Sequence, residues 1–327
     1  MAGVAETVRA GGKQQAALFG LSRPQLVAFV VLAGAVALAP LVLYPIYLMK
    51  VMCFALFACA FNLLLGYVGL LSFGHAAYFG MGGYITAHAA KVIGLSPELA
   101  ILGGGIVAAL LGTGFGWLAI RRAGIYFAMI TLALAQMIYF FCVQAPFTGG
   151  EDGIQQVPRG RLFGVVDLAP DMTMYWVVAA IFLGGFLAIH RIIHSPFGQV
   201  LKAVRDNEPR ATSLGYRTEH YKLMAFVLSA FLAGIAGGTK SIVFGIATLT
   251  DVYWTMSGEV VLMTLLGGMG TMFGPAAGAL VIITMQNYLA EFGAWVTIIQ
   301  GGIFIACVLA FRRGIIGEFA RLLRVSL

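Results

Sequence analysis

Long apolar runs recur along the whole of this 327-residue chain, and they constrain its fold more than any single motif. A helix that crosses the hydrocarbon core of a bilayer, roughly 30 Å thick, needs about 20 apolar residues. The chain is 61% apolar and only 10% charged, whereas a soluble chain carries about 25% charged residues. Transmembrane β-strands would appear as short segments in which apolar and polar residues alternate, and the apolar runs have no such pattern. The sequence therefore predicts an all-α, polytopic membrane protein.

We expect about ten transmembrane helices, of which one or two are broken or re-entrant. The runs 70–90 and 254–267 are the two candidates for such half-length segments. The N-terminal segment 1–25 and the C-terminal tail 312–327 would flank a transmembrane domain at 26–311. The expected spans are 26–46, 50–66, 70–90, 99–119, 124–145, 174–193, 221–240, 254–267, 274–290 and 294–311.

The distribution of Lys and Arg tests this arrangement, because cytoplasmic loops carry an excess of both. With the N-terminus inside, fifteen of the 20 Lys and Arg residues fall on the inner side. The five on the outer side are Lys50, Lys91, Arg159, Arg161 and Lys240. Both termini are thus expected in the cytoplasm. The net charge of +7 then reflects the inner membrane face and not a nucleic-acid surface.

The longest cation-rich interruption between two apolar runs extends from His194 to Lys222. Ser195 and Pro196 are typical of a helix N-cap followed by proline in the first turn. The apolar positions that follow have helical spacing and predict a short amphipathic helix; they are Phe197, Val200, Leu201 and Val204. We expect Pro209 to end this helix and a second short turn to run from Ala211 to Gly215. The segment is either a solvated loop or the attachment point of a soluble partner, and we favour the partner.

Residues 146–173 form the one long loop expected on the outer side. The loop contains several acidic residues and prolines, and it begins with the turn-like sequence Thr148-Gly149-Gly150. A loop of this length is either a disordered connector or a docking surface. We favour docking, because binding surfaces concentrate on such loops.

Two segments far apart in the chain resemble each other. Leu64–Gly69 and the following Phe73–Ala77 correspond to Leu265–Gly270 and Phe273–Ala277, with one residue deleted between the two parts. Both are glycine-interrupted apolar segments, which in transporters are typical of broken helices around a translocation path. The span count gives both copies the same orientation, and the repeat would be inverted if one weak span were re-entrant.

The sequence offers no constellation for catalysis. His190 and His194 have a spacing that could hold a metal, but no third ligand is near, so contact with lipid headgroups is the better interpretation. Gly234–Ser241 nearly matches a phosphate-binding loop, yet Thr239 replaces its second glycine. We expect Lys240 to extend to the outer interface instead. The cysteines Cys53, Cys59, Cys142 and Cys307 are expected to be buried free thiols.

Few polar side chains lie inside the expected spans; they are Asn62, His75, His88, Gln136, Glu259, Gln286 and Asn287. An ionisable group within the membrane is a functional candidate by default. Glu259 is the strongest of these, with an interfacial carboxylate as the equal alternative. A proton-coupled carrier would show several acidic or histidine groups in relay positions, so their scarcity counts against ion-coupled transport.

From about residue 48 onward, the chain resembles the LivM-type permease of branched-chain amino acid ABC transporters. The segments that carry the resemblance are Phe61–His75, Gly124–Met129, Thr148–Gly153, Ser195–Gly198, Arg205–Glu208 and Leu266–Thr271. The polar stretch after His194 coincides with the cytoplasmic coupling segment of that family. The general importer signature there is Glu-Ala-Ala, three residues, then Gly. This chain keeps only Ala211 and Gly215, with Pro209 and Arg210 in the other two places.

The resemblance implies a permease subunit of an importer in the bacterial inner membrane, not an enzyme. Its partners would be a homologous second permease subunit, two cytoplasmic ATPase subunits that hold ATP and Mg, and a periplasmic substrate-binding protein. The chain itself would bind no cofactor, metal or nucleic acid, and would contact membrane lipid. Its cargo would be branched-chain or related amino acids, with urea, amides or aromatic acids as alternatives. A stand-alone secondary carrier or channel, or a membrane-embedded enzyme, remains a rival class.

Three sets of residues follow from this interpretation. The expected contacts to the ATPase are Phe197, Leu201, Val204, Arg205, Glu208, Ala211 and Gly215. The expected lining of the translocation path is Asn62, Phe73, His75, Tyr78, Glu259, Gly267 and Gly268. The expected docking site for the binding protein is Gly149, Gly150, Glu151 and Asp152.

Overall fold

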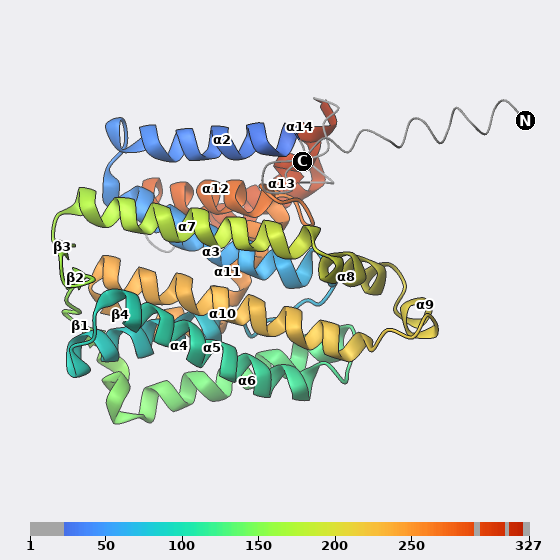
Figure 1. The fold of residues 1–327 in the computed structure, drawn as a ribbon, viewed down its shortest axis with the longest axis horizontal. Helices are drawn as coiled ribbons and strands as arrows, with labels where there is room; N and C mark the ends of the chain where they lie inside the picture. The colour runs from blue at the N-terminus through green and yellow to red at the C-terminus, as the bar shows by residue number, and fades with distance from the viewer. Residues whose placement is uncertain (1–22, 291–294, 311–313, 323–327) are drawn as a thin grey trace, which may run out of the picture.

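The computed structural model describes residues 23–290, 295–310 and 314–322, and helices account for most of them (Figure 1). The α-helices are α2 (Arg23–Leu38), α3 (Pro45–Leu65), α4 (His75–His88), α5 (Pro97–Ala119), α6 (Ile125–Gln144), α7 (Asp171–His194), α8 (Pro196–Asp206), α9 (Glu208–Ser213), α10 (Thr218–Phe244), α11 (Trp254–Gly267), α12 (Gly274–Tyr288), α13 (Trp295–Ala310) and α14 (Gly314–Leu322). Short helical turns are η2 (Ala39–Leu41), η3 (Ala89–Ile93), η4 (Pro146–Thr148), η5 (Gly150–Asp152) and η6 (Leu249–Asp251). The short strands are β1 (Ile154–Gln155), β2 (Arg161–Leu162), β3 (Val166–Asp167) and β4 (Ile246–Ala247).

The structure supports a polytopic membrane protein. Five described helices are long and apolar enough to cross a membrane: α3, α5, α6, α7 and α10. Helices α11, α12 and α13 coincide with the expected spans 254–267, 274–290 and 294–311 to within two residues. Helix α2 ends at Leu38, eight residues before the expected end of the first span at 46. Helix α3 begins at Pro45 instead of residue 50. Proline fits the first turn of a helix because its missing N–H has no partner there.

The expected span 70–90 is only partly helical. No helix covers residues 66–74, and α4 begins at His75. Backbone groups inside a membrane need partners within the protein. Three N–H groups here find side-chain oxygens: Phe73 N donates to Thr131 Oγ1 at 3.1 Å, Gly74 N to Ser72 Oγ at 3.2 Å and Ala76 N to Ser257 Oγ at 2.9 Å. The hydroxyls allow this segment to leave the helix within the bundle.

Glycines bring α4, α5 and α10 into close contact. A methyl group at Gly237 of α10 would lie 1.8 Å from the carbonyl oxygen of Phe79 in α4, and one at Gly82 would lie 2.4 Å from that of Gly234. A methyl group at Gly104 of α5 would lie 2.5 Å from the Gly82 oxygen. Small residues at these helix crossings let the backbones of neighbouring helices approach each other closely. In a membrane, where the hydrophobic effect does not drive helices together, such close contact provides van der Waals packing energy.

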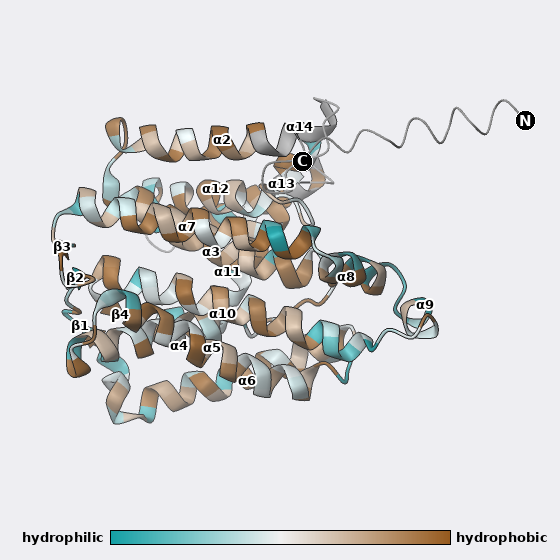
Figure 2. Ribbon diagram, viewed as in Figure 1, coloured by the Kyte–Doolittle hydropathy of each residue, from teal (hydrophilic) through white to brown (hydrophobic). Residues whose placement is uncertain are grey.

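The bundle has two chemically different ends (Figures 1 and 2). Helices α8 and α9 project from one end, between the end of α7 and the start of α10, and hydrophilic residues gather there. The strands lie at the opposite end, where β1 pairs antiparallel with β4 and β2 with β3. The bundle between the ends is mostly apolar, as expected for a membrane-spanning region.

The termini fall partly outside the described residues. The predicted N-terminal segment is described only from Arg23, where α2 begins. Within the predicted C-terminal tail, α14 contacts α11 and α12. A methyl group at Gly314 would lie 2.4 Å from Gly268 Cα, so this part of the tail is packed against the bundle.

Replacing Gly237 with alanine should destabilise the protein. The added methyl group would overlap the Phe79 carbonyl and force α4 and α10 apart, at a cost of about 1–3 kcal/mol. The melting temperature in detergent measures the effect. Gly103→Ala in α5 is the matched control, because nothing lies within 4 Å of its added methyl group. Equal melting temperatures for the two variants would contradict this packing.

Candidate functional site

Helices α8 and α9 form the projecting segment that the sequence predicted. Ser195 Oγ accepts a hydrogen bond from Gly198 N at 3.3 Å, which confirms the predicted N-cap. The prediction for Pro209 was wrong. Helix α8 already ends at Asp206, and Pro209 lies in the first turn of α9, where Asn207 Oδ1 caps Arg210 N at 3.0 Å.

The apolar side of the segment faces this chain and not a soluble partner. Leu201 is 0% exposed, Val204 is 3% exposed and Ala211 is 2% exposed. The sequence had assigned them to the ATPase contact, but in this structure their side chains are buried within the chain, and Leu201 belongs to the apolar core of the bundle. The free apolar surface lies just beyond α9, where Leu214 is 71% and Tyr216 is 41% exposed. Sequence reasoning missed both residues, although Leu214 precedes the predicted Gly215.

Two contacts fix the segment to the start of α10. Glu208 Oε1 pairs with Lys222 Nζ at 2.5 Å. The ring of Phe197 stacks on that of Tyr221, with centroids 5.7 Å apart. The Lys222 side chain is only 7% exposed, so this ion pair is partly withdrawn from solvent. The predicted residues Phe197 and Glu208 therefore connect α8 and α9 to a membrane helix.

Arg205, an exposed residue of α8, extends to the turns at the end of the bundle. Its Nη1 donates a hydrogen bond to the Gly66 carbonyl in the turn that follows α3. A methyl group at Gly69 would lie 3.3 Å from Arg205 Cγ, and one at Gly270 would lie 3.2 Å from Arg205 Nη1. One guanidinium thus lies against both glycine-rich turns of the internal repeat.

Asn62 joins the same two turns directly. Its Nδ2 donates to the Thr271 carbonyl at 2.9 Å, and its Oδ1 accepts from Gly270 N at 3.0 Å. The side chain is 2% exposed. Asn62 was predicted to line the translocation path, and its geometry instead gives it a structural link between the copies of the repeat.

The contacts also fix the orientation of the repeat. Tyr47, near the start of α3, meets Thr284, near the end of α12, while Asn62, near the end of α3, meets Thr271 ahead of α12. Helices α3 and α12 are therefore antiparallel. Helices α11 and α12 are joined by the short turn at residues 268–273 and pack together, so α11 runs parallel to α3. Both copies have the same orientation.

The remaining predicted path residues lie mostly inside the protein. His75 is 0% and Tyr78 is 1% exposed, and both rings pack edge-on against Phe226. His75 Nε2 is 2.8 Å from Ser229 Oγ, which donates to the Ala60 carbonyl. Phe73 is partly exposed. His75 and Tyr78 form an aromatic cluster that supports the broken span, and they do not face an open path in this structure.

Gly267 and Gly268 serve close packing and turn formation. A methyl group at Gly267 would lie 1.8 Å from the Gly274 carbonyl oxygen. Gly268 has φ +126°, a backbone conformation that residues with a side chain rarely adopt. Both are buried, so their position explains the glycines without placing them on a path surface.

Glu259 lines a cavity of about 330 Å³ near the end of the bundle that carries the strands. It accepts a hydrogen bond from Gln286 Nε2 at 3.0 Å. The same cavity is lined by Lys50 and by Lys240, which pairs with Asp251 at 2.6 Å. Lys240 was expected to extend to the interface, but this ion pair holds it inside the protein. Lys50 and Asp251 had not been predicted as site residues.

The long loop at this end is folded. Backbone pairing joins β1 to β4, and Arg159 Nη1 donates to Asp171 Oδ1 at 2.6 Å and to the Ala169 carbonyl at 2.9 Å. Gly149 and Gly150 have φ of +78° and +61°, which explains the paired glycines. Glu151 and Asp152 are exposed beside them, so the four predicted docking residues lie together on the surface.

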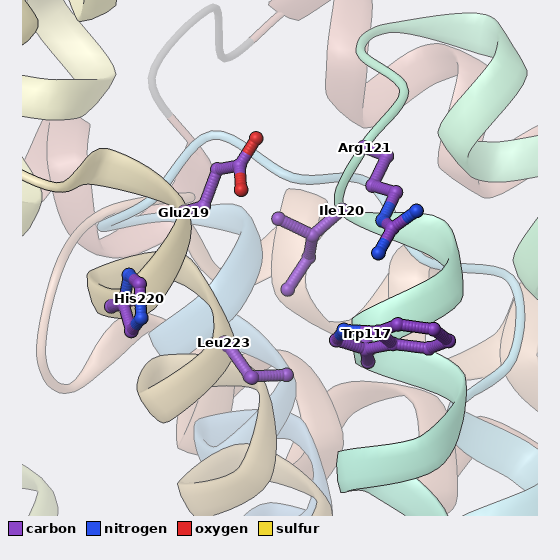
Figure 3. A pocket seen from close by; sticks show the side chains of 7 residues that line it. Trp117, Ile120, Arg121, Glu219, His220 and Leu223 are labelled. Atoms are coloured by element: carbon purple, nitrogen blue, oxygen red, sulfur yellow. The ribbon is translucent and has the colours of Figure 1, made fainter.

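A second, smaller cavity lies near α8 and α9, between the end of α5 and the start of α10 (Figure 3). Its volume is about 130 Å³. The Arg121 guanidinium lies 4.3 Å from the centre of the Trp117 ring. Glu219 and Leu223 lie across from them. This mixed cationic, aromatic and acidic lining is typical of a membrane interface.

His190 and His194 stack with ring centroids 4.2 Å apart. His194 Nδ1 is 3.0 Å from the His190 carbonyl oxygen. No group of three or more potential metal ligands occurs among the described residues. Cys53, Cys59 and Cys142 are buried free thiols, as predicted.

A bundle of apolar helices with an interrupted span and an amphipathic segment, α8 and α9, at one end is typical of a membrane transport subunit. The chain belongs to the family described as "Branched-chain amino acid transport system / permease component", whose model matches residues 44–308. No solved structure matches the chain.

Several curated relatives are named as permease proteins of this kind. The high-affinity branched-chain amino acid transport system permease protein LivM of Salmonella typhimurium is 25% identical over 288 residues, covering 81% of this chain and 68% of the relative. A probable LivM of Methanocaldococcus jannaschii is 26% identical, covering 70% and 76%. The LivH permease of S. typhimurium is 21% identical, covering 81% and 91%. The resemblance stated from the sequence is therefore confirmed.

Replacing Asn62 with alanine should loosen the two glycine turns. Two buried hydrogen bonds would be lost, which should reduce stability by about 1–3 kcal/mol. The melting temperature of the detergent-solubilised protein should fall. Asn287→Ala is the control, because Asn287 is exposed in α12, and a similar fall in that variant would argue against a specific role for Asn62.

Proposed function

We propose that this chain is the transmembrane permease subunit of an ATP-binding cassette importer that moves branched-chain amino acids inward across the bacterial inner membrane. Two cytoplasmic ATPase subunits would supply the energy, and a periplasmic binding protein would deliver the cargo. Both termini and the α8–α9 segment would lie in the cytoplasm. We retain ten passes of the membrane, with α4 and α11 as the shortened ones.

The observation that carries the proposal is the contact of Arg205 with the two glycine turns. Helix α8 lies outside the apolar bundle but is attached to it by buried Leu201 and by the Gly66 carbonyl. A force applied to α8 would therefore reach the ends of α3 and α11 without passing through a flexible loop. Rigid transmission to discontinuous helices is what a rocking transporter requires.

The ATPase contact would use the outer face of the segment. Leu214 and Tyr216 provide an exposed apolar tip, and exposed Arg210 and Gly215 flank it. An apolar anchor surrounded by charge is a typical arrangement for a specific protein interface. In this proposal Arg205 transmits the movement of α8 to the glycine turns. The sequence had predicted instead that Arg205 contacts the ATPase directly.

The partner permease and the binding protein follow from the family. One relative is named LivH and others are named LivM, so a second, homologous permease is the natural partner of this chain. Exposed Glu151 and Asp152, on the folded loop opposite α8 and α9, would face the binding protein. Exposed acidic residues at the edge of an interface speed up the association of two proteins and help to orient them.

Leu214→Glu should weaken assembly with the ATPase subunits. The charged side chain cannot enter an apolar groove, so we expect at least about tenfold less ATP-driven uptake in proteoliposomes. Co-purification of the ATPase subunits measures assembly. Leu95→Glu, which alters an exposed leucine (40% exposed) near the opposite end of the bundle, is the control and should assemble normally. Normal assembly of Leu214→Glu would overturn the revised contact surface.

Arg205→Ala should uncouple hydrolysis from transport. The ATPase subunits should still bind and hydrolyse ATP, while leucine uptake falls at least about tenfold because α8 no longer holds the Gly66 turn. Arg122→Ala, an exposed arginine next to α5, is the control. Undiminished uptake by Arg205→Ala would refute the transmission step. Leucine flux through the reconstituted chain without ATPase subunits would instead indicate a secondary carrier or channel.

A further inference from the structure

The charged cavity near the end of the bundle opposite α8 and α9 has the size of a small-molecule site. Its volume is about 330 Å³, within the range of roughly 300–1,000 Å³ for ligand pockets. Residues of α3, α10, η6, α11 and α12 meet in it. The polar lining is Lys50, Lys240, Asp251, Glu259 and Gln286, and the apolar lining is Phe54, Phe244, Ile246 and Met256.

One pair of opposite charges in the cavity is already satisfied. Lys240 Nζ and Asp251 Oδ2 are 2.6 Å apart, and their side chains are 13% and 8% exposed. Thr248 Oγ1 donates a further hydrogen bond to Asp251 Oδ2 at 3.0 Å. This pair connects α10 to the turn before α11 and leaves little capacity for a ligand.

Lys50 and Glu259 form no ion pair among the described residues, although their opposite charges attract each other. Lys50 makes no hydrogen bond or ion pair within the described part of the chain. Glu259 accepts a hydrogen bond only from the neutral amide of Gln286, again among the described residues. Removing a charge from water without a partner is costly, and ionisable residues held within a membrane bundle mark functional sites.

We propose that this cavity binds the zwitterionic headgroup of an α-amino acid. Lys50 would pair with the carboxylate of the ligand, and Glu259, held by Gln286, would pair with its ammonium. The apolar wall would then contact an aliphatic side chain. This proposal rests on the proposed function and specifies the substrate class that the permease itself recognises.

The charge count distinguishes a zwitterion from the other cargo classes. The cavity holds two ammonium and two carboxylate groups and is formally neutral. A zwitterion satisfies both unpaired groups without changing this balance. An aromatic acid would leave Glu259 unpaired and facing the ligand's own negative charge. Lys50 and Glu259 are both partly exposed. Urea or an amide would leave both of their charges without an ionic partner, and polar groups left unpaired in a site are what make it reject an analogue.

The test is a binding measurement on the complete transporter in nanodiscs, without the binding protein. The probes are leucine, 4-methyl-2-oxopentanoate, which lacks the ammonium, and 3-methylbutylamine, which lacks the carboxylate. Wild type should bind leucine at least about tenfold more tightly than either analogue. Lys50→Met should lose the preference for leucine over the amine. Glu259→Gln should lose the preference for leucine over the oxo acid.

Matched controls separate a binding role from a structural one. Lys91→Met and Glu98→Gln change charged residues near the same end that line no part of this cavity, and both should keep the wild-type preferences. Lys50→Arg and Glu259→Asp should restore part of the preference that Lys50→Met and Glu259→Gln lose. The melting temperature of each variant shows whether it folds.

The outcomes also separate this proposal from the proposed function. If ATP-driven leucine uptake occurs but Lys50→Met and Glu259→Gln keep the wild-type preferences, the cavity assignment is wrong and the importer function stands. Loss of stability without loss of preference would likewise overturn the assignment. If no ATP-driven uptake of leucine occurs but the preferences change as expected, the cavity assignment stands and the proposed function fails.

Discussion

Backbone that leaves the helix inside a membrane must still find hydrogen-bond partners, and the structure of this protein depends on how two glycine turns meet that requirement. The Asn62 side chain bonds to Gly270 and Thr271, and Arg205 bonds to Gly66. Each turn therefore depends in part on a side chain that lies outside it. The two copies of the repeat are thus joined at the point where helix α8 touches both.

Close packing at glycines holds two groups of helices together. Helices α4, α5 and α10 approach through glycines whose added methyl groups would overlap neighbouring backbone, so their separation is fixed. Helices α11 and α12 are packed just as closely, because a methyl group at Gly278 of α12 would lie 1.8 Å from the Met263 carbonyl oxygen in α11. Transporters commonly alternate between two states by moving such packed groups of helices relative to one another.

Charge is concentrated at the two ends for different purposes. Near α8 and α9, Lys222 and Glu208 hold the projecting segment in register. Near the strands, Lys240 and Asp251 form an ion pair, while Lys50 and Glu259 are the residues proposed to bind a ligand. On this proposal, the same types of residue serve packing at one position and recognition at another, and their partners distinguish the two roles.

The sequence by itself determined the class of protein, the approximate spans and the position of the amphipathic segment α8–α9. These features follow from the length of apolar runs, the distribution of Lys and Arg and helix capping, which are local properties of the sequence. It also located the interrupted span 70–90 and the short span 254–267, since glycine-interrupted runs are visible without a fold. The tertiary structure decided what each residue does. Leu201 and His75 looked like contact and path residues, yet their burial depends on helices distant in the chain. Lys50, Asp251 and Glu259 line one cavity because α3, η6 and α11 lie close together in the fold. These elements are far apart in the sequence, so no local sequence pattern could predict the cavity.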